Sequence, residues 1–233
     1  PAILDVLRTF SAQMDLSAFE FFSQSALDKV TAQMGHAVPF ATQTPFYALL
    51  EFESAAEAEL DKAMALFEQT VEQGWVLDGV LSQSLSQAEA LWKLREDISE
   101  TLWHWQPYKN DISVLVSRMP GFLREVDELV DKSYPDFELV WYGHIGDGNL
   151  HLNILKPKAL SNKDFVARCV PVSKEIGQLL AKYEGSVSAE HGVGLLKKDY
   201  LHYSRSPLEL ELMKQIKKVF DPNAILNPGK LFD

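Results

Sequence analysis

The residues best suited to chemistry gather in one glycine-rich stretch, residues 143–153, which reads GHIGDGNLHLN. Asp147-Gly148 is a common two-residue hairpin turn, of the type I′ kind that needs a positive φ at both positions. A turn centred there would put His144 directly opposite His151 on one face of the hairpin, with Cβ atoms about 4.5–5.5 Å apart. Two imidazoles held at that spacing can share one metal ion.

The alternative is an ordinary hairpin that carries two half-exposed histidines. The glycines at 143, 146 and 148 favour a binding site over this alternative, because they leave backbone accessible to a ligand. Asn153 follows His151 on the same face, since strand side chains alternate between faces. We therefore treat His144, His151 and Asn153 as candidate site residues.

A second cluster lies in residues 185–194, which read GSVSAEHGVG and follow a long predicted helix. Glu190 and His191 are adjacent in this Gly/Ser-rich turn, which is a poor place for core packing. The Glu190 carboxylate would complete a set of two histidines and one glutamate, which leaves an open coordination position of the catalytic kind. His191 would then remain available as a base. The alternative is a surface loop with a charged pair, and spacing alone does not decide between the two.

The elements that must position these residues alternate between strands and helices. Four capping patterns begin with serine, at Ser17, Ser54, Ser86 and Ser206. Apolar periodicity predicts helices at 1–14, 17–30, 54–73, 86–98, 121–132, 164–184, 195–201 and 206–220. It predicts strands at 46–52, 75–84, 111–118, 137–143 and 151–155.

This order predicts an α+β fold, with a ferredoxin-like antiparallel sheet that has helices on one face and a mainly helical C-terminal part. We expect an N-terminal helical segment at 1–40, a ferredoxin-like part at 41–155, and a C-terminal helical part at 156–233. No linker is long enough to separate independent domains, so the three parts form one continuous domain.

Composition limits the classes of partner. The chain has 33 acidic and 22 basic residues and a formal net charge of −11, which argues against nucleic acid. No apolar run approaches the roughly 18–20 residues of a transmembrane helix. The single cysteine, Cys169, excludes an internal disulfide and fits a reducing compartment, so we expect a cytoplasmic protein.

Three ordered motifs carry a resemblance that spans essentially the whole chain: GHIGDGNLHLN at 143–153, SAEHGVG at 188–194 and DPNAILNPGKLF at 221–232. Together they resemble the C-terminal domain of FAD-linked oxidases of the vanillyl-alcohol-oxidase superfamily. The resemblance is strongest to the D-2-hydroxyglutarate and D-lactate dehydrogenases and the glycolate oxidase flavin subunits. It implies a substrate-binding cap followed by C-terminal helices that fold back on a flavin domain.

The resemblance also implies a role for each matching residue. His144, His151 and Glu190 would bind a divalent metal, usually zinc, and His191 would take the proton of the substrate's 2-hydroxyl group. The remaining matches are a carboxylate-binding arginine at Arg95, a small hydroxyl residue at Ser99, a second cation at Lys109, a substrate amide at Asn153, and Asn227 near the flavin. Without the resemblance, Arg95 near a helix end would be interpreted as a complement to the helix dipole.

The implied reaction oxidises a D-2-hydroxy acid to the 2-oxo acid with hydride transfer to FAD. Nothing in the chain resembles the glycine-rich pyrophosphate contacts of a flavin domain. We therefore expect the C-terminal part of a longer enzyme, whose partners are an FAD domain and a small anionic substrate, and which holds no FAD and is inactive alone. A homodimer is left open. Two alternatives remain: a free-standing zinc hydrolase that uses His144, His151 and Glu190, and a non-catalytic binding domain.

Overall fold

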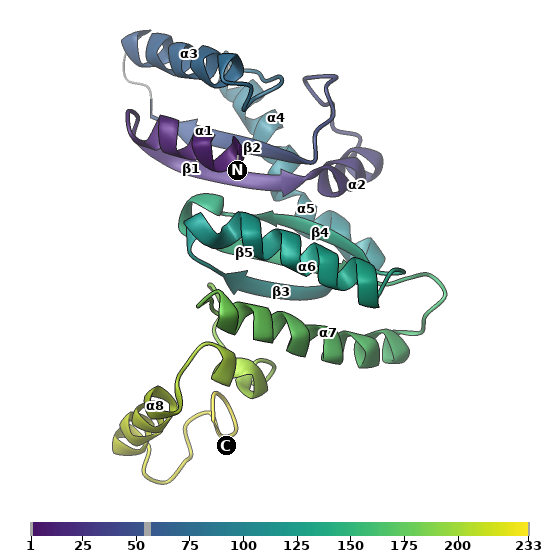
Figure 1. Ribbon diagram of the computed structural model, residues 1–233, viewed down its shortest axis with the longest axis vertical. Helices are drawn as coiled ribbons and strands as arrows, with labels where there is room; N and C mark the ends of the chain where they lie inside the picture. Colours follow the sequence, from purple (N-terminus) through teal and green to yellow (C-terminus); the bar gives the residue numbers. More distant parts are fainter. Residues whose placement is uncertain (1, 54–56, 233) are drawn as a thin grey trace. The chain divides into compact units, whose positions relative to one another are not determined.

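A computed structural model gives the structure of the protein and describes residues 2–53 and 57–232 (Figure 1). Its strands are β1 (Leu16–Ser23), β2 (Phe46–Phe52), β3 (Tyr108–Ser113), β4 (Glu138–Gly143) and β5 (Asn149–Leu155). Its α-helices are α1 (Ala2–Ser11), α2 (Gln24–Met34), α3 (Glu57–Glu72), α4 (Leu85–Glu96), α5 (Ile98–Thr101), α6 (Met119–Ser133), α7 (Asn162–Lys182) and α8 (Pro207–Phe220). Short 3₁₀ helices are η1 (Leu102–Trp105), η2 (Val116–Arg118), η3 (Ile145–Asp147) and η4 (Lys198–Tyr203).

The strands form a five-stranded sheet in the order β2-β1-β4-β5-β3. Strand β1 runs antiparallel to both β2 and β4. The predicted α+β class with an antiparallel sheet is therefore confirmed. The chain divides into two compact units, one formed by 1–107, 139–148 and 153–155 and the other by 108–138, 149–152 and 156–233.

In the first unit, strands β1 and β2 lie side by side with α1 and α3 nearby (Figure 1). The β1–β2 register pairs Phe22 with Tyr47, whose rings stack with centroids 5.5 Å apart. Helices α2, α4 and α5 supply apolar side chains to the same core. Its fully buried members include Val30, Ile98 and Leu102.

In the second unit, α6 and α7 pack against each other. Helix α6 buries a stripe at helical spacing, which consists of Met119, Phe122, Val126 and Val130. Helix α7 buries Cys169 on its inner face, and burial raises the pKa of this thiol to about 12. Helix α8 begins at the predicted capping box, in which Ser206 and Glu209 bond each other's backbone N–H groups.

The predicted helix over 17–30 is wrong in its first half. Residues 16–23 form strand β1, and Ser23, not Ser17, caps the helix that follows by accepting the Ala26 N–H. The sequence FEFF at 19–22 is rich in aromatic residues, which favour strands, and β2 offers it a partner along its whole length. Pairing with a distant strand outweighed the local capping pattern.

Three further boundaries differ from expectation. The strand predicted at 75–84 is irregular chain. The cap of helix α4 lies two residues before the predicted one, because Ser84, not Ser86, accepts the Gln87 N–H, and the helix begins at Leu85. The strand predicted at 111–118 is β3, which ends at Ser113, and η2 follows it. The cap predicted at Ser54 lies outside the described residues.

Across residues 2–53 and 57–232, none of the helices combines the length and the hydropathy that crossing a bilayer requires.

Truncation of Ile98, which is fully buried in the first unit's core, tests this packing. Ile98→Ala should lower the free energy of unfolding by about 2–5 kcal/mol, since it removes buried methyl groups and leaves a cavity. Leu85→Ala is the control, because Leu85 is 84% exposed and its loss should change stability by less than about 0.5 kcal/mol. Urea denaturation followed by circular dichroism measures both, and equal effects would contradict the described core.

Candidate functional site

The chain segment between β4 and β5 holds the two histidines of the first motif. The predicted type I′ turn is wrong, because Asp147 lacks the positive φ that such a turn needs. Instead η3 forms a 3₁₀ turn, in which the Asp147 N–H bonds the His144 carbonyl at 3.0 Å. Gly148 ends this turn with φ +80°, a left-handed backbone conformation that glycine adopts most readily. His144 therefore sits just after a strand, while His151 lies within β5.

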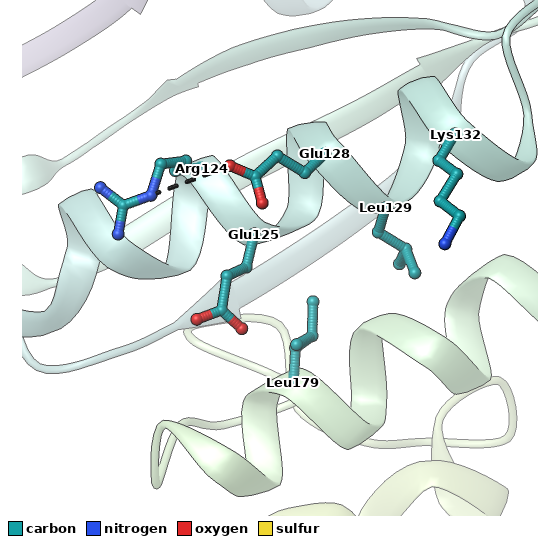
Figure 2. A pocket seen from close by; sticks show the side chains of 6 residues that line it. All are labelled: Arg124, Glu125, Glu128, Leu129, Lys132 and Leu179. Atoms are coloured by element: carbon teal, nitrogen blue, oxygen red, sulfur yellow. Dashed lines mark ion pairs between the residues drawn. The ribbon is translucent and has the colours of Figure 1, made fainter.

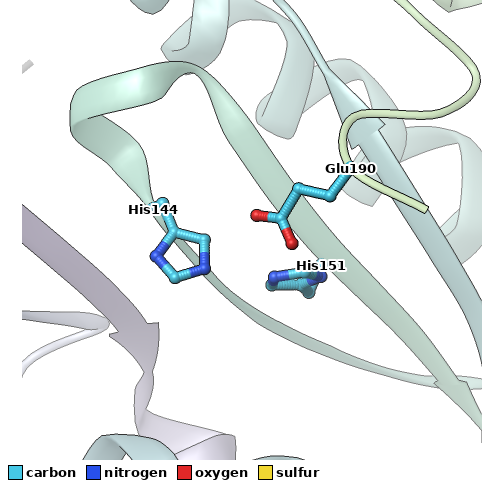
Figure 3. A group of neighbouring side chains, drawn as sticks. All are labelled: His144, His151 and Glu190. Atoms are coloured by element: carbon cyan, nitrogen blue, oxygen red, sulfur yellow. The ribbon is translucent and has the colours of Figure 1, made fainter. Parts of the chain in front are cut away.

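The three predicted metal ligands come together despite the different turn. One ligand atom from each of His144, His151 and Glu190 lies within 4.8 Å of the other two. Figure 3 shows the two imidazole rings and the carboxylate facing a common space. Both histidines are half-buried and Glu190 is exposed.

A buried glutamate that the sequence analysis had assigned to a helix contacts two predicted site residues. Glu20, on β1, is 4% exposed. Its Oε1 lies 2.7 Å from Nδ1 of His144, and its Oε2 lies 2.8 Å from Nη2 of Arg95. The Arg95 guanidinium also lies 4.8 Å from the ring centroid of Tyr142, at cation–π distance. Arg95 is 7% exposed, so it does not simply complement a helix dipole at the surface.

A second buried acid, Asp111 on β3, organises the loop of the second motif. Its Oδ2 accepts the backbone N–H groups of Glu190 at 3.0 Å and His191 at 3.2 Å. Lys197 donates to the Asp111 carbonyl at 2.8 Å. Burial acts to raise the pKa of the Asp111 carboxyl, but these N–H groups and the charge of Lys197 outweigh it and hold the pKa below its ordinary value.

Asp111 also faces the ring nitrogens of two histidines. Its Oδ1 lies 3.8 Å from Nδ1 of His151, and its Oδ2 lies 3.5 Å from Nδ1 of His191. The His191 side chain is 69% exposed, and its ring centroid lies 6.4 Å from that of His151. His191 is thus anchored through its backbone while its imidazole stays open to a ligand.

The Glu190 carboxylate has a further partner in Asn149, the first residue of β5, whose side-chain amide donates to it. Glu20, Asp111 and Asn149 were all missed from sequence. All three are polar residues at 4–5% exposure. Only Glu20 stands alone among apolar strand residues, in FEFF at 19–22, and this isolated polarity is the signal that could have found it. Asp111 lies in the mostly polar strand YKNDIS and Asn149 is the first residue of β5, so neither gave such a signal.

The other predicted residues occupy different elements. Asn153 is 1% exposed on β5, and Ser99 is half-buried on α5. Lys109 lies on β3 two residues before Asp111, and desolvation lowers the pKa of its ammonium group. Asn227 is exposed in the tail after α8, with a left-handed φ of +48°.

A shallow hollow of about 480 Å³ lies elsewhere, over α6 and α7 (Figure 2). Arg124 and Glu128 of α6 face each other along its rim at 4.0 Å. Glu125 is held by Lys182 and Tyr183, whose hydrogen bonds lower the pKa of its carboxyl. The charged groups Arg124, Glu125 and Glu128 are thus paired with neighbouring side chains. None of the predicted site residues lines the hollow.

Comparison with known proteins identifies the family of the chain. The family model for FAD linked oxidases, C-terminal domain, matches residues 2–231. The chain belongs to this family. The resemblance inferred from the three motifs is thereby confirmed.

Three curated relatives match nearly the whole length of the chain. It is 59% identical over 231 residues to a D-2-hydroxyglutarate dehydrogenase of Stutzerimonas stutzeri, covering 99% of this chain and 50% of that protein. It is 54% identical to a protein of the same name from Xanthomonas citri, covering 99% and 49%. A mitochondrial D-2-hydroxyglutarate dehydrogenase of Bos taurus is 36% identical, covering 98% and 41%. The chain thus spans about half the length of these relatives or less.

A solved structure shares the fold. The 4-ethylphenol oxidase from Gulosibacter chungangensis, solved as an isoeugenol complex, matches with a TM-score of 0.65 at 12% identity. The match covers 100% of this chain and 51% of that one. At this identity the likeness concerns the fold alone.

Replacing Asp111 tests whether it holds the loop of Glu190 and His191. Asp111→Ala should speed hydrogen exchange of the Glu190 and His191 amides by roughly one to two orders of magnitude, because an acceptor bond worth about 1–3 kcal/mol is lost. Asp111→Asn retains one acceptor oxygen and should give an intermediate rate. Exchange followed by NMR measures this, with Asp131→Ala on the exposed side of α6 as the control. Unchanged exchange rates of these two amides in Asp111→Ala would show that the loop does not depend on Asp111.

Proposed function

We propose that this chain is the metal- and substrate-binding part of an FAD-dependent dehydrogenase that oxidises a D-2-hydroxy acid to the 2-oxo acid. The observation that carries the proposal is the approach of His144, His151 and Glu190 to within 4.8 Å, next to an open His191. The family match supports an oxidoreductase over the zinc hydrolase that the sequence had left open. The names of the relatives favour D-2-hydroxyglutarate as the first substrate to test.

The donor set suits a divalent cation, with zinc as the first choice. Two imidazole nitrogens and one carboxylate oxygen are ligands that zinc accepts, and three protein ligands leave one position for substrate. The Nδ1 atoms of the two histidines face carboxylates, at 2.7 Å for His144 and 3.8 Å for His151. Such carboxylates commonly orient metal-binding histidines. When bound, the cation would supply Lewis-acid polarisation of the substrate's hydroxyl group.

We assign the proton transfer to His191. Its backbone is tied to Asp111, and its Nδ1 faces the same carboxylate, which would stabilise the imidazolium that forms on accepting a proton. Arg95 would bind the substrate carboxylate with the guanidinium donors that Glu20 does not engage. Lys109 would add a second cation, and Ser99 and Asn153 would supply polar contacts.

FAD would accept the hydride from C2 of the substrate, and we expect the segment that binds it to lie in the half of the relatives that this chain does not span. Asn227 in the exposed tail would lie near the flavin. The outward apolar residues of α8 agree with a C-terminal part that packs on a flavin domain. They are 48–76% exposed: Leu208, Leu212, Ile216 and Val219. The three segments at 1–40, 41–155 and 156–233, the homodimer and the cytoplasmic location stay predictions.

A chimera tests the proposal, in which the N-terminal half of the Stutzerimonas stutzeri relative is fused to this chain. It should retain FAD, and D-2-hydroxyglutarate should bleach its flavin absorbance anaerobically while the L-enantiomer does not. His191→Asn should lower kcat by about 10²–10⁴-fold with little change in KM, as expected for a lost general base. His104→Asn is the matched control, because His104 is exposed on η1, outside the predicted set.

A chimera that retains both FAD and metal, yet is reduced by no D-2-hydroxy acid, would contradict the proposed function. Flavin retention on gel filtration separates that outcome from a failure to assemble.

A further inference from the structure

Burying a carboxylate on a strand destabilises the fold unless hydrogen-bond donors or cations surround it. Glu20 is such a group: it lies between Phe19 and Phe21 on β1 and pairs with Leu49 of β2 in the strand register. Its side chain is 5% exposed, so solvent contributes little to its stabilisation. The partners that offset this cost are therefore informative about its role.

Each oxygen of Glu20 contacts a different partner. Oε1 lies 2.7 Å from Nδ1 of His144, and Oε2 lies 2.8 Å from Nη2 of Arg95. If Glu20 served only to neutralise Arg95, a bidentate pair with the guanidinium would be the favoured geometry. Instead one oxygen is directed to the imidazole. We propose that Glu20 is a positioning residue that joins the candidate metal ligand His144 to the candidate substrate cation Arg95.

The first consequence concerns the tautomer of His144. An ionised carboxylate only accepts hydrogen bonds, so Nδ1 of His144 must carry the hydrogen in this contact. The lone pair of the neutral ring is then on Nε2, which is the ring atom that can bind a cation. Glu20 thus prepares His144 as a ligand before any metal arrives.

The second consequence concerns Arg95. Its guanidinium is held between the Glu20 carboxylate and the Tyr142 ring, whose centroid lies 4.8 Å away. Arg95 and His144 therefore contact the two oxygens of one buried carboxylate. This inference rests on the proposed function for the roles of these two partners, and it adds that metal binding and carboxylate binding are coupled through Glu20.

Glu20→Gln separates the two contacts because it keeps the shape but has one acceptor oxygen and one donor group. The charged Arg95 should take the oxygen, which leaves the amide NH₂ facing Nδ1 of His144 and favours the wrong tautomer. Zinc affinity of the chain, measured by calorimetry, should fall by about 10–100-fold, as for other residues that orient metal ligands. Far-ultraviolet circular dichroism checks that the variant is folded.

Asp221→Asn is the matched control. Asp221 is also a buried carboxylate, 6% exposed, that accepts from Lys217 and from the Ile225 and Leu226 N–H groups. The zinc affinity of the Asp221→Asn variant should equal that of the wild type. An equal loss in both variants would mean that any buried acid matters, and it would overturn a specific role for Glu20.

A rescue makes the test stricter. In Glu20→Gln/Arg95→Met the competing cation is absent, so the amide oxygen can turn to the His144 ring and restore its tautomer. Zinc affinity should recover at least partly from the loss seen with Glu20→Gln alone. No recovery in a folded double variant would overturn the proposed coupling.

Nitrogen-15 NMR of histidine reads the tautomer directly in the metal-free chain. At about pH 9, well above the usual imidazole pKa, His144 should carry its hydrogen on Nδ1 in the wild type and on Nε2 in Glu20→Gln. A wild-type ring with the hydrogen on Nε2 would overturn the inference. If the wild type shows the Nδ1 tautomer but binds no zinc, the Glu20 contact stands and the proposed metal function fails.

Discussion

The candidate site depends on the cost of burying a carboxylate inside a sheet. A buried acid must gather donors around it, and those donors then lose their freedom. Asp111 on β3 binds the backbone N–H groups of Glu190 and His191 and thereby fixes the backbone position of both residues. Glu20 on β1 does the same for the side chains of His144 and Arg95. The residues proposed to perform chemistry are thus held by two acids that need not touch substrate.

The local parts of this arrangement could be predicted from sequence. The strand at 46–52 matched its predicted bounds, and helix α8 begins at the predicted capping box, because turn and cap preferences depend on neighbouring residues. The grouping of His144, His151 and Glu190 was also expected. The two histidines are seven positions apart in the chain, and the short connection keeps them close whatever the turn type.

The long-range parts could not be predicted in this way. Glu20 looked like the glutamate of a capping box that begins three residues earlier at Ser17, and only the pairing of β1 with β2 and β4 makes it a buried strand residue. Asp111 is 79 positions from Glu190, so no periodic pattern links them. The type I′ turn failed for a related reason: Ile145, at 1% exposure, is buried within η3, where a two-residue turn would have kept it in a strand.

The central claim is that this chain builds a metal site from His144, His151 and Glu190 using its own fold. Elemental analysis of the purified chain, loaded with zinc and then exhaustively dialysed, tests it most directly. We predict about one zinc ion per chain in the wild type, as expected for a three-ligand protein site, and almost none in His151→Ala. His104→Ala, which alters an exposed histidine on η1, should retain the wild-type content. A wild-type chain without zinc, or equal zinc in His151→Ala, would contradict the account.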